Sequence, residues 1–198
     1  MSVAQYNSLK ARGLALAYAA QLLQFYEQVY YCLPWMDVVK NGIGFRQPKG
    51  VQADDRYLTV WVIIDQSDDA GFGALAAERR VSAMFSRYGV DLLRRMSRVA
   101  GVASDGNVQG FGVVLSWLKP GSASSKQPVN ETLALFIDKS SVADFLAKRL
   151  PQVEFVRRAR FAVFDGTEEL GRLPLEVWED TFNVTFKLKG YEPPKGKC

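Results

Sequence analysis

The sequence has no histidine and only two cysteines among its 198 residues. Without histidine, the chain lacks Ser-His-Asp and Cys-His catalysis, His-ligated zinc, and an imidazole that titrates near neutral pH. The two cysteines, Cys32 and Cys198, form no CxxC motif. The chemistry that remains open uses carboxylates, lysine, tyrosine, serine or cysteine.

Cys32 lies within an aromatic stretch, residues 30–35, and we expect it to be a small buried hydrophobic residue. Cys198 is the last residue of the sequence, and we expect it to be exposed and mobile. A disulfide between the two needs an oxidising compartment. The sequence alone leaves this pairing open.

Long hydrophobic runs are also missing. The longest apolar stretch, residues 13–25, is interrupted by Gln21 and Gln24 and is shorter than the roughly 20 residues that span a bilayer. We therefore predict no membrane span. With Lys10 and Arg12 before it, the stretch resembles a signal peptide. The compartment, cytoplasmic or exported after processing, stays open.

Charge of either sign is moderate. The chain carries 25 Lys and Arg against 21 Asp and Glu, a net charge of +4, and 48% of its residues are hydrophobic. This balance predicts a folded globular protein rather than a disordered one. Because nucleic-acid binders usually concentrate far more positive charge, we do not expect a nucleic-acid partner.

The patterning predicts one α+β domain over residues 1–198. An amphipathic helical segment within residues 1–39, capped by Ser2 and ended by Pro34, is expected to pack on the core. Residues 41–50 are rich in turn residues, and a C-terminal extension covers residues 171–198.

Residues 51–170 indicate a duplicated βαβ core. Strands are predicted at residues 57–64, 108–118, 132–137 and 154–164, and helices at 75–99 and 142–150. Ile64-Asp65-Gln66-Ser67 in the first half matches Ile137-Asp138-Lys139-Ser140 in the second. The expected fold is a two-layer sandwich with a ferredoxin-like βαββαβ core. The N-terminal helix would then cover part of the other face of the sheet.

Three residues after the first predicted strand suggest a cation site. Asp65, Ser67 and Asp69 resemble the metal-ion-dependent adhesion motif of von Willebrand factor A domains, Asp-x-Ser-x-Ser, with Asp69 in place of the second serine. The resemblance implies binding of a hard cation by short oxygen ligands. Capping of the following helix explains both copies of the motif, and we favour it.

A glycine-rich strand carries a second resemblance. Gln109-Gly110-Phe111-Gly112-Val113 is similar to the RNP1 strand of RNA-recognition motifs, which implies RNA bases stacked on aromatic rings. Gln109 replaces the basic residue and Val113 replaces an aromatic one. Glycines around an aromatic residue in a strand more often mark a bulge or a close approach of another element, and we favour this interpretation.

The helix predicted at residues 75–99 has an apolar stripe and an arginine stripe. The arginines recur at steps of seven, seven and four, at Arg80, Arg87, Arg94 and Arg98. Such a ridge could bind an anion or an acidic partner, but a solvated helix face is the preferred interpretation.

Aromatic residues crowd the end of the N-terminal helix. We expect most of them to be buried, with Trp35 and Met36 partly exposed as a candidate protein-binding patch. Together these features predict a non-catalytic binding or assembly module that needs no cofactor and engages a protein partner or its own copy. The alternatives are a module dependent on a metal or ligand at the Asp65 loop and an anion or nucleic-acid binder on the Arg80–Arg98 face.

Overall fold

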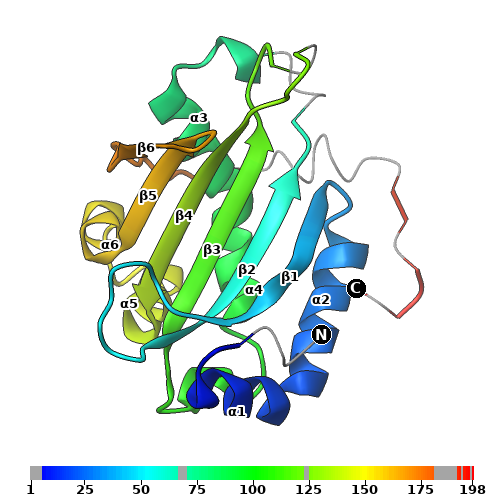
Figure 1. Ribbon diagram of the computed structural model, residues 1–198, viewed down its shortest axis with the longest axis vertical. Helices are drawn as coiled ribbons and strands as arrows, with labels where there is room; N and C mark the ends of the chain where they lie inside the picture. Colours follow the sequence, from blue (N-terminus) through cyan, green and yellow to red (C-terminus); the bar gives the residue numbers. More distant parts are fainter. Residues whose placement is uncertain (1–5, 67–70, 123–124, 181–190, 193, 197) are drawn as a thin grey trace.

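The computed structural model describes residues 6–66, 71–122, 125–180, 191–192, 194–196 and 198. Its centre is a six-stranded sheet whose strand order follows the chain (Figure 1). The strands are β1 (Met36–Arg46), β2 (Arg56–Ile64), β3 (Val108–Leu118), β4 (Asn130–Asp138), β5 (Arg160–Asp165) and β6 (Glu168–Gly171). Strands β2 and β3 are parallel, and every other neighbouring pair is antiparallel.

Helical elements connect the strands. The helices are α1 (Leu9–Ala17), α2 (Ala19–Cys32), α3 (Ala77–Met84), α4 (Val90–Met96), α5 (Lys139–Leu146) and α6 (Gln152–Arg158). A π-helical turn, η3 (Phe85–Gly89), joins α3 to α4, and short 3-10 turns occur at η2 (Phe72–Ala74) and η4 (Val102–Ser104). The fold is therefore mixed α+β, as the sequence predicts.

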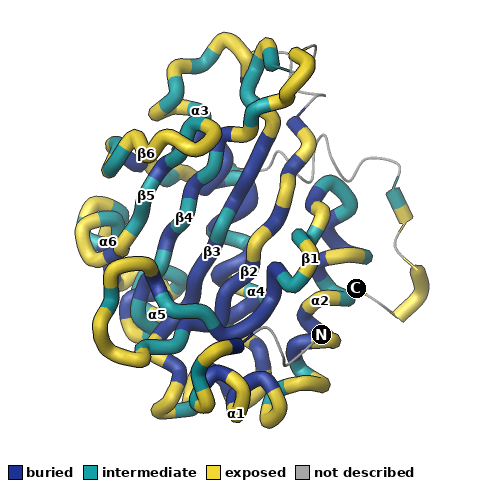
Figure 2. Tube along the Cα trace, in the orientation of Figure 1, coloured by how far each residue is buried: buried dark blue, intermediate teal, exposed yellow. Residues whose placement is uncertain are grey.

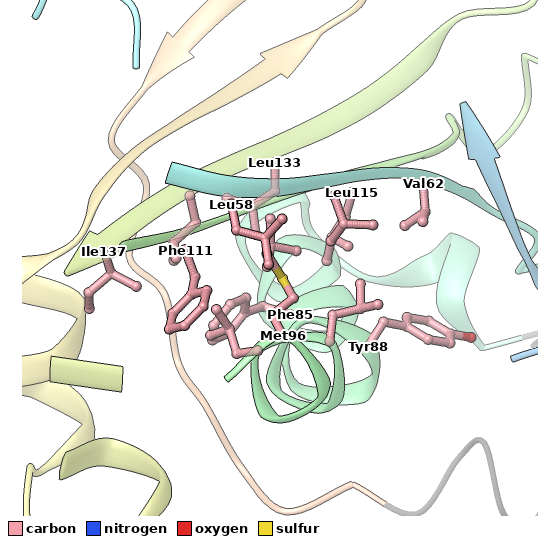
Figure 3. Packing of buried hydrophobic residues seen from close by; sticks show 14 of the residues in the cluster. Leu58, Val62, Phe85, Tyr88, Met96, Phe111, Leu115, Leu133 and Ile137 are labelled. Atoms are coloured by element: carbon pink, nitrogen blue, oxygen red, sulfur yellow. The ribbon is translucent and has the colours of Figure 1, made fainter. Parts of the chain in front are cut away.

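The core lies between one face of the sheet and the helices behind it (Figures 1 and 3). Leu58, Phe111 and Leu115 point from the strands toward Phe85 and Met96 on the helices, and all five are at most 1% exposed. Each such side chain contributes about 1.5–3 kcal/mol when it is removed from water. The predicted apolar stripe of residues 75–99 is thus the face that covers the sheet.

The N-terminal helix differs from the prediction in two ways. It is divided at Tyr18 into α1 and α2, and the residue that caps α1 is Ser8, whose Oγ accepts a hydrogen bond from the Ala11 amide at 3.3 Å. Ser2 lies outside the described residues. In addition, α2 and α4 line the same hollow, so α2 lies on the helical side of the sheet and not over its other face.

Strand β1 occupies residues that we predicted as turns. Its pairing with β2 jumps from Val38↔Val62 to Ile43↔Val60, so residues 39–42 of β1 stand opposite a single residue of β2. Asn41, with φ of 59°, allows this bulge. Residues 41–46 therefore belong to an edge strand with an irregularity, whereas the turn predicted at residues 48–50 is found between β1 and β2, where the Val51 amide donates to the Pro48 carbonyl.

The second half of the core is not a copy of the first. Residues 154–164 were predicted as one strand, but residues 152–158 form α6 and only residues 160–165 form β5. Strand β5 runs antiparallel to β4, whereas β3 runs parallel to β2. The ferredoxin-like arrangement is not confirmed, since the strands of each predicted unit are direct neighbours and the sheet has six strands.

The C-terminal extension returns across the helices to the N-terminal region. The Glu176 amide donates to Ser82 Oγ at 3.0 Å, and the Trp178 amide donates to Ser86 Oγ at 3.1 Å. Further along, Tyr191 Oη donates to the Tyr31 carbonyl at 2.8 Å. A disulfide joins Cys198 to Cys32 at the end of α2, so the expected mobile terminus is instead tethered.

Candidate functional site

The face of the sheet opposite the core is open in its upper part, whereas the β1–β2 connection, residues 47–55, passes in front of its lower part (Figure 1). The structure places α3, α4, α5 and α6 behind the sheet, and none of the described helices crosses its front (Figure 1). Along β2, buried and exposed residues alternate towards the C-terminal end of the strand, which Figure 2 shows as alternating colours. Trp61 is 39% exposed and Ile63 is 43% exposed, and Leu118 on β3 is 41% exposed. We call these three residues the open-face cluster.

The register of the strands shows that this cluster is contiguous. Trp61 pairs with Val114, and Ile63 pairs with Ser116, two residues before Leu118 on the same strand. Residues two apart on a strand share a face, so all of these side chains lie together on the front of the sheet. Trp61, Ile63, Leu118 and Val114 are apolar or aromatic, and Ser116 among them is buried, so the exposed part of the cluster is an apolar surface.

The polar groups in this area bond to one another. Trp61 Nε1 donates to Ser116 Oγ at 3.0 Å, and Ser116 Oγ lies 3.0 Å from Thr132 Oγ1 on β4. This chain of hydrogen bonds crosses three strands. It holds the indole of Trp61 in one orientation while leaving much of its ring exposed.

Two glycines of β3 allow aromatic rings to meet across that strand. Tyr57 and Phe136 form an edge-to-face pair with centroids 5.6 Å apart. A Cβ at Gly112 would lie 2.6 Å from the Phe136 ring, and one at Gly110 would lie 2.8 Å from the Tyr57 ring. The close-approach interpretation of these glycines is therefore confirmed.

The same register argues against the RNP1 resemblance. Phe111, the aromatic residue of that motif, is 1% exposed and packs on the helical side of the sheet. Val113 also faces the core. Bases stacked on this strand in the manner of RNA-recognition motifs would need the opposite orientation.

Arg80 lies away from the surface, contrary to the predicted arginine stripe. Its Nε donates to Glu131 Oε2 at 2.8 Å, and a second bond joins Nη2 to Oε1. Trp117 Nε1 also donates to Glu131, at 2.7 Å. The hydrogen bonds to Glu131 raise the pKa of Arg80. This buried ion pair fastens α3 to β4 and is a structural feature.

Arg87 is also engaged within the fold. Its Nη1 donates to Gln66 Oε1 at 3.0 Å, and its Nε lies 3.3 Å from Asp180 of the C-terminal segment. The π-helical turn at Phe85–Gly89 contains Arg87 and interrupts the 3.6-residue period from which one stripe was predicted. The four arginines therefore do not form a continuous ridge.

Arg94 and Arg98 remain at the surface, at the end of α4. Both line a hollow of about 450 Å³ between α2 and α4 and a second of about 670 Å³ beside α5. Arg94 also lines a third hollow, of about 490 Å³, which includes Arg87. The structure thus brings Arg94 and Arg98 together and Arg87 close to Arg94, while Arg80 lies apart.

The Asp65 loop is described only in part. Ser67 and Asp69 lie outside the described residues, so the predicted cation site stays a prediction. Among the residues that the structure describes, no group of three or more His, Cys, Asp or Glu side chains is arranged to hold a metal ion. The first described α-helix after this loop, α3, begins at Ala77 with Ala76 as its cap, so Asp65 does not cap it.

Asp138, in the second copy of the motif, has the predicted capping role. Its carboxylate accepts hydrogen bonds from the Ser141 amide at 2.7 Å and from Ser140 Oγ at 2.6 Å at the start of α5. Burial acts to raise the pKa of Asp138, but these hydrogen bonds outweigh it, and the pKa is lowered. The two copies of the motif therefore differ in what they do.

The aromatic residues at the end of α2 differ from the prediction that most of them are buried, since Tyr26 and Tyr30 are 37% and 51% exposed and stack with ring centroids 6.0 Å apart. Trp35 is half-buried, but Met36 is only 3% exposed and belongs to the core. Met36 begins β1 and pairs with Ile64, which places its side chain on the covered face of the sheet. Trp35 with Met36 is therefore not the exposed patch that the sequence suggested.

No family model, curated protein or solved structure matches this chain. In the described part of the chain, no helix has both the length and the apolar character needed to cross a bilayer. The open-face cluster is the largest departure from what the sequence predicted, since β2 was expected to be a buried strand.

Proposed function

We propose that the chain is a non-catalytic assembly module whose open sheet face packs against the same face of a second copy. The observation that carries the proposal is the open-face cluster, Trp61, Ile63 and Leu118, on a sheet face that no described helix covers. Exposed apolar surface of this kind commonly marks a protein interface. Sheets packed face to face are a standard solution for burying it.

The chemistry of the face favours a second copy as its occupant. A two-fold interface brings each residue close to its own kind, so like charges at its centre would repel. Trp61, Ile63 and Leu118 are uncharged, and so are Val114 and Ala134 beside them. One charged residue, Asp37 on the edge strand β1, pairs with Ile63 and lies on the same face. Self-association therefore meets no like charges among these five uncharged residues, and the only charge beside them among the paired positions is that of Asp37 at the edge of the sheet.

If a second copy covers the open face, few polar side chains on it lose a hydrogen-bond partner. Trp61 Nε1, Ser116 Oγ and Thr132 Oγ1 already bond to one another. A partner that excludes water from them would not strip away their hydrogen bonds. Trp61 is in addition held in place before association, which reduces the side-chain entropy lost on binding.

The test is the mass of the protein in solution. We expect sedimentation velocity from about 1 to 200 µM to show the 22.1 kDa chain converting to a species of about twice that mass. The double variant Ile63→Lys with Leu118→Lys should remain monomeric, because it places four ammonium groups in a two-fold interface. The matched control is Val153→Lys, since Val153 is 80% exposed on α6.

Three results would count against the proposal. These are a wild-type chain that stays monomeric at the highest concentration, a double variant that still dimerises, and a control that loses the dimer equally. A monomeric wild-type chain that binds a different protein through Trp61 and Ile63 would replace the second copy with that partner. Circular dichroism and the melting temperature of each variant establish that it is folded.

A further inference from the structure

The hollow between α2 and α4 has the features of a binding site for a small anion, independently of the open sheet face. Its volume is about 450 Å³, within the range of small-molecule sites. One wall carries Arg94, Arg95 and Arg98, and the opposite wall carries Gln21, Gln24 and Gln28. We call it the α4 arginine hollow.

The charge in this hollow is positive. Three guanidinium groups face one side-chain carboxylate, that of Asp91. Asp91 already accepts from Arg95 Nε at 2.8 Å and from Arg94 Nη1 at 3.3 Å. The carbonyl end of α4 adds about half a negative charge and offsets part of the excess. A net positive charge remains, so the hollow attracts anions.

Arg94 and Arg95 are bonded to Asp91, whereas the guanidinium of Arg98 offers N–H donors that are not engaged by Asp91. Arg98 lies two residues beyond the end of α4. Its backbone amide donates to the Arg95 carbonyl at 3.1 Å, while its guanidinium has no hydrogen-bond or ion-pair partner among the described residues. Arg98 also borders the neighbouring hollow of about 670 Å³, which no Asp or Glu lines among the described residues. Its fork of N–H groups matches the oxygens of a phosphate or carboxylate.

The glutamines of the opposite wall add uncharged hydrogen-bonding groups to the hollow. Gln21, Gln24 and Gln28 are spaced by three and four residues, so they share one face of α2. Their amides both donate and accept, which suits hydroxyl groups beside an anionic centre. Because the wall is uncharged, it does not neutralise the arginines opposite. The two walls together fit a polar anion better than an apolar ligand.

We infer that the α4 arginine hollow binds a small organic anion, a phosphate ester or a hydroxy acid, with Arg98 as its principal ligand. Arg94 and Arg95 contribute positive charge from the same wall, and the glutamines contact the hydroxyl groups. Phosphate is tetrahedral and carboxylate is planar, but both present pairs of anionic oxygens that a guanidinium group recognises. The experiment separates the two by using one probe of each kind.

The test is a titration of the whole chain, with its disulfide intact, with glycerol 3-phosphate, citrate and neutral glycerol at constant ionic strength. We expect saturable binding of at least one anion by calorimetry and none of glycerol. In nitrogen–proton spectra, the side-chain amides of Gln24 and Gln28 should shift during the same titration. Which anion binds tells phosphate from carboxylate recognition.

Arg98→Gln should weaken the binding about tenfold or more, as expected when a charged hydrogen-bonding partner is lost. The matched control is Arg157→Gln, because Arg157 is an exposed arginine paired with Glu154 on α6 and lines none of these hollows. The proposal is overturned if neither anion saturates below about 10 mM, if Arg98→Gln binds like the wild type, or if Arg157→Gln weakens binding as much. Unchanged glutamine amide signals on binding would also overturn it.

Discussion

The two faces of the sheet use the same kinds of residue for different purposes. Behind the sheet, Phe111 and Leu115 of β3 both point toward the helices and are fully buried. On the front face, Trp61 and Ile63 of β2 and Leu118 of β3 remain in contact with water. An apolar side chain in a strand therefore indicates burial in the core on one face and an available surface on the other.

Helices explain this asymmetry. The connection from β2 to β3 carries α3 and α4, and the connection from β4 to β5 carries α5 and α6. Both connections run over the same face (Figure 1). The N-terminal helix α2 joins them there, so the front of the sheet receives no helical cover from the described residues. Replacing one phenylalanine by alanine on each face tests whether the two faces differ in burial.

The largest effect is expected for Phe111→Ala. Removing this buried ring should lower the free energy of unfolding by about 3–5 kcal/mol, because it deletes apolar contacts and leaves a cavity. Phe136→Ala, on the front of β4, should cost less than half as much, because Phe136 is only half-buried. Urea unfolding of the monomeric chain measures both. Equal costs would mean that the front face is covered.

An intermediate effect is expected from the buried ion pair. Glu131→Ala should lower the free energy of unfolding by about 3 kcal/mol, because it leaves Arg80 without its carboxylate in a buried position. Asp144→Ala breaks the exposed pair with Arg149 and should change it by less than about 1 kcal/mol. Chemical unfolding at pH 7 compares them. Similar values would show that the Arg80 pair is well solvated.

The smallest effect concerns the helix that covers β3 and β4. Asp138→Ala should cost about 1 kcal/mol at pH 7 through loss of the α5 cap. The folded pKa of Asp138 is lowered, so this contribution is present above its ordinary value of 3.8 and is lost as the pH falls through the folded value. Unfolding measured from pH 7 to pH 3 should show the gap between wild type and variant closing. A gap that does not narrow at any pH below 3.8 would contradict the role of the ionised carboxylate.

The sequence predicted several elements correctly because local patterns were strong. Strand β3 was expected at residues 108–118 and is found there, and the burial of Val81, Phe85 and Leu92 follows from their helical spacing. The cap at Asp138 was likewise readable from an acid followed by a hydroxyl residue after a strand. These features depend on neighbours within a few residues.

Other predictions failed where distant contacts decide the outcome. Residues 154–158 have the composition of a strand, yet Phe155 is buried from a helix that packs beside α5. Arg80 was predicted on a solvated stripe, but Glu131, 51 residues away, draws it inside. The spacing of residues along one element could not reveal either partner.

The candidate sites follow the same division. Arg94 and Arg98 were identified from their spacing, because the end of one helix keeps them together. Trp61, Ile63 and Leu118 were not, since an apolar strand has the same appearance whether one or both of its faces are covered. A local signal was that Tyr57, Thr59 and Trp61, whose side chains carry an O–H or N–H group, stand at alternate positions of β2.

By itself the sequence determined which chemistries this protein lacks, where its main strands and longest helical run lie, and that Arg94 and Arg98 stand together at the end of one helix. Its amino-acid types and their local periodicity suffice for these features. Only the tertiary structure decided that the strands lie side by side in chain order and that all four crossover helices share one face. The physical reason is that apolar burial depends on area and not on direction. From the sequence, Leu115 and Trp61 are equally suited to burial. Long-range packing decides which of the two side chains is buried.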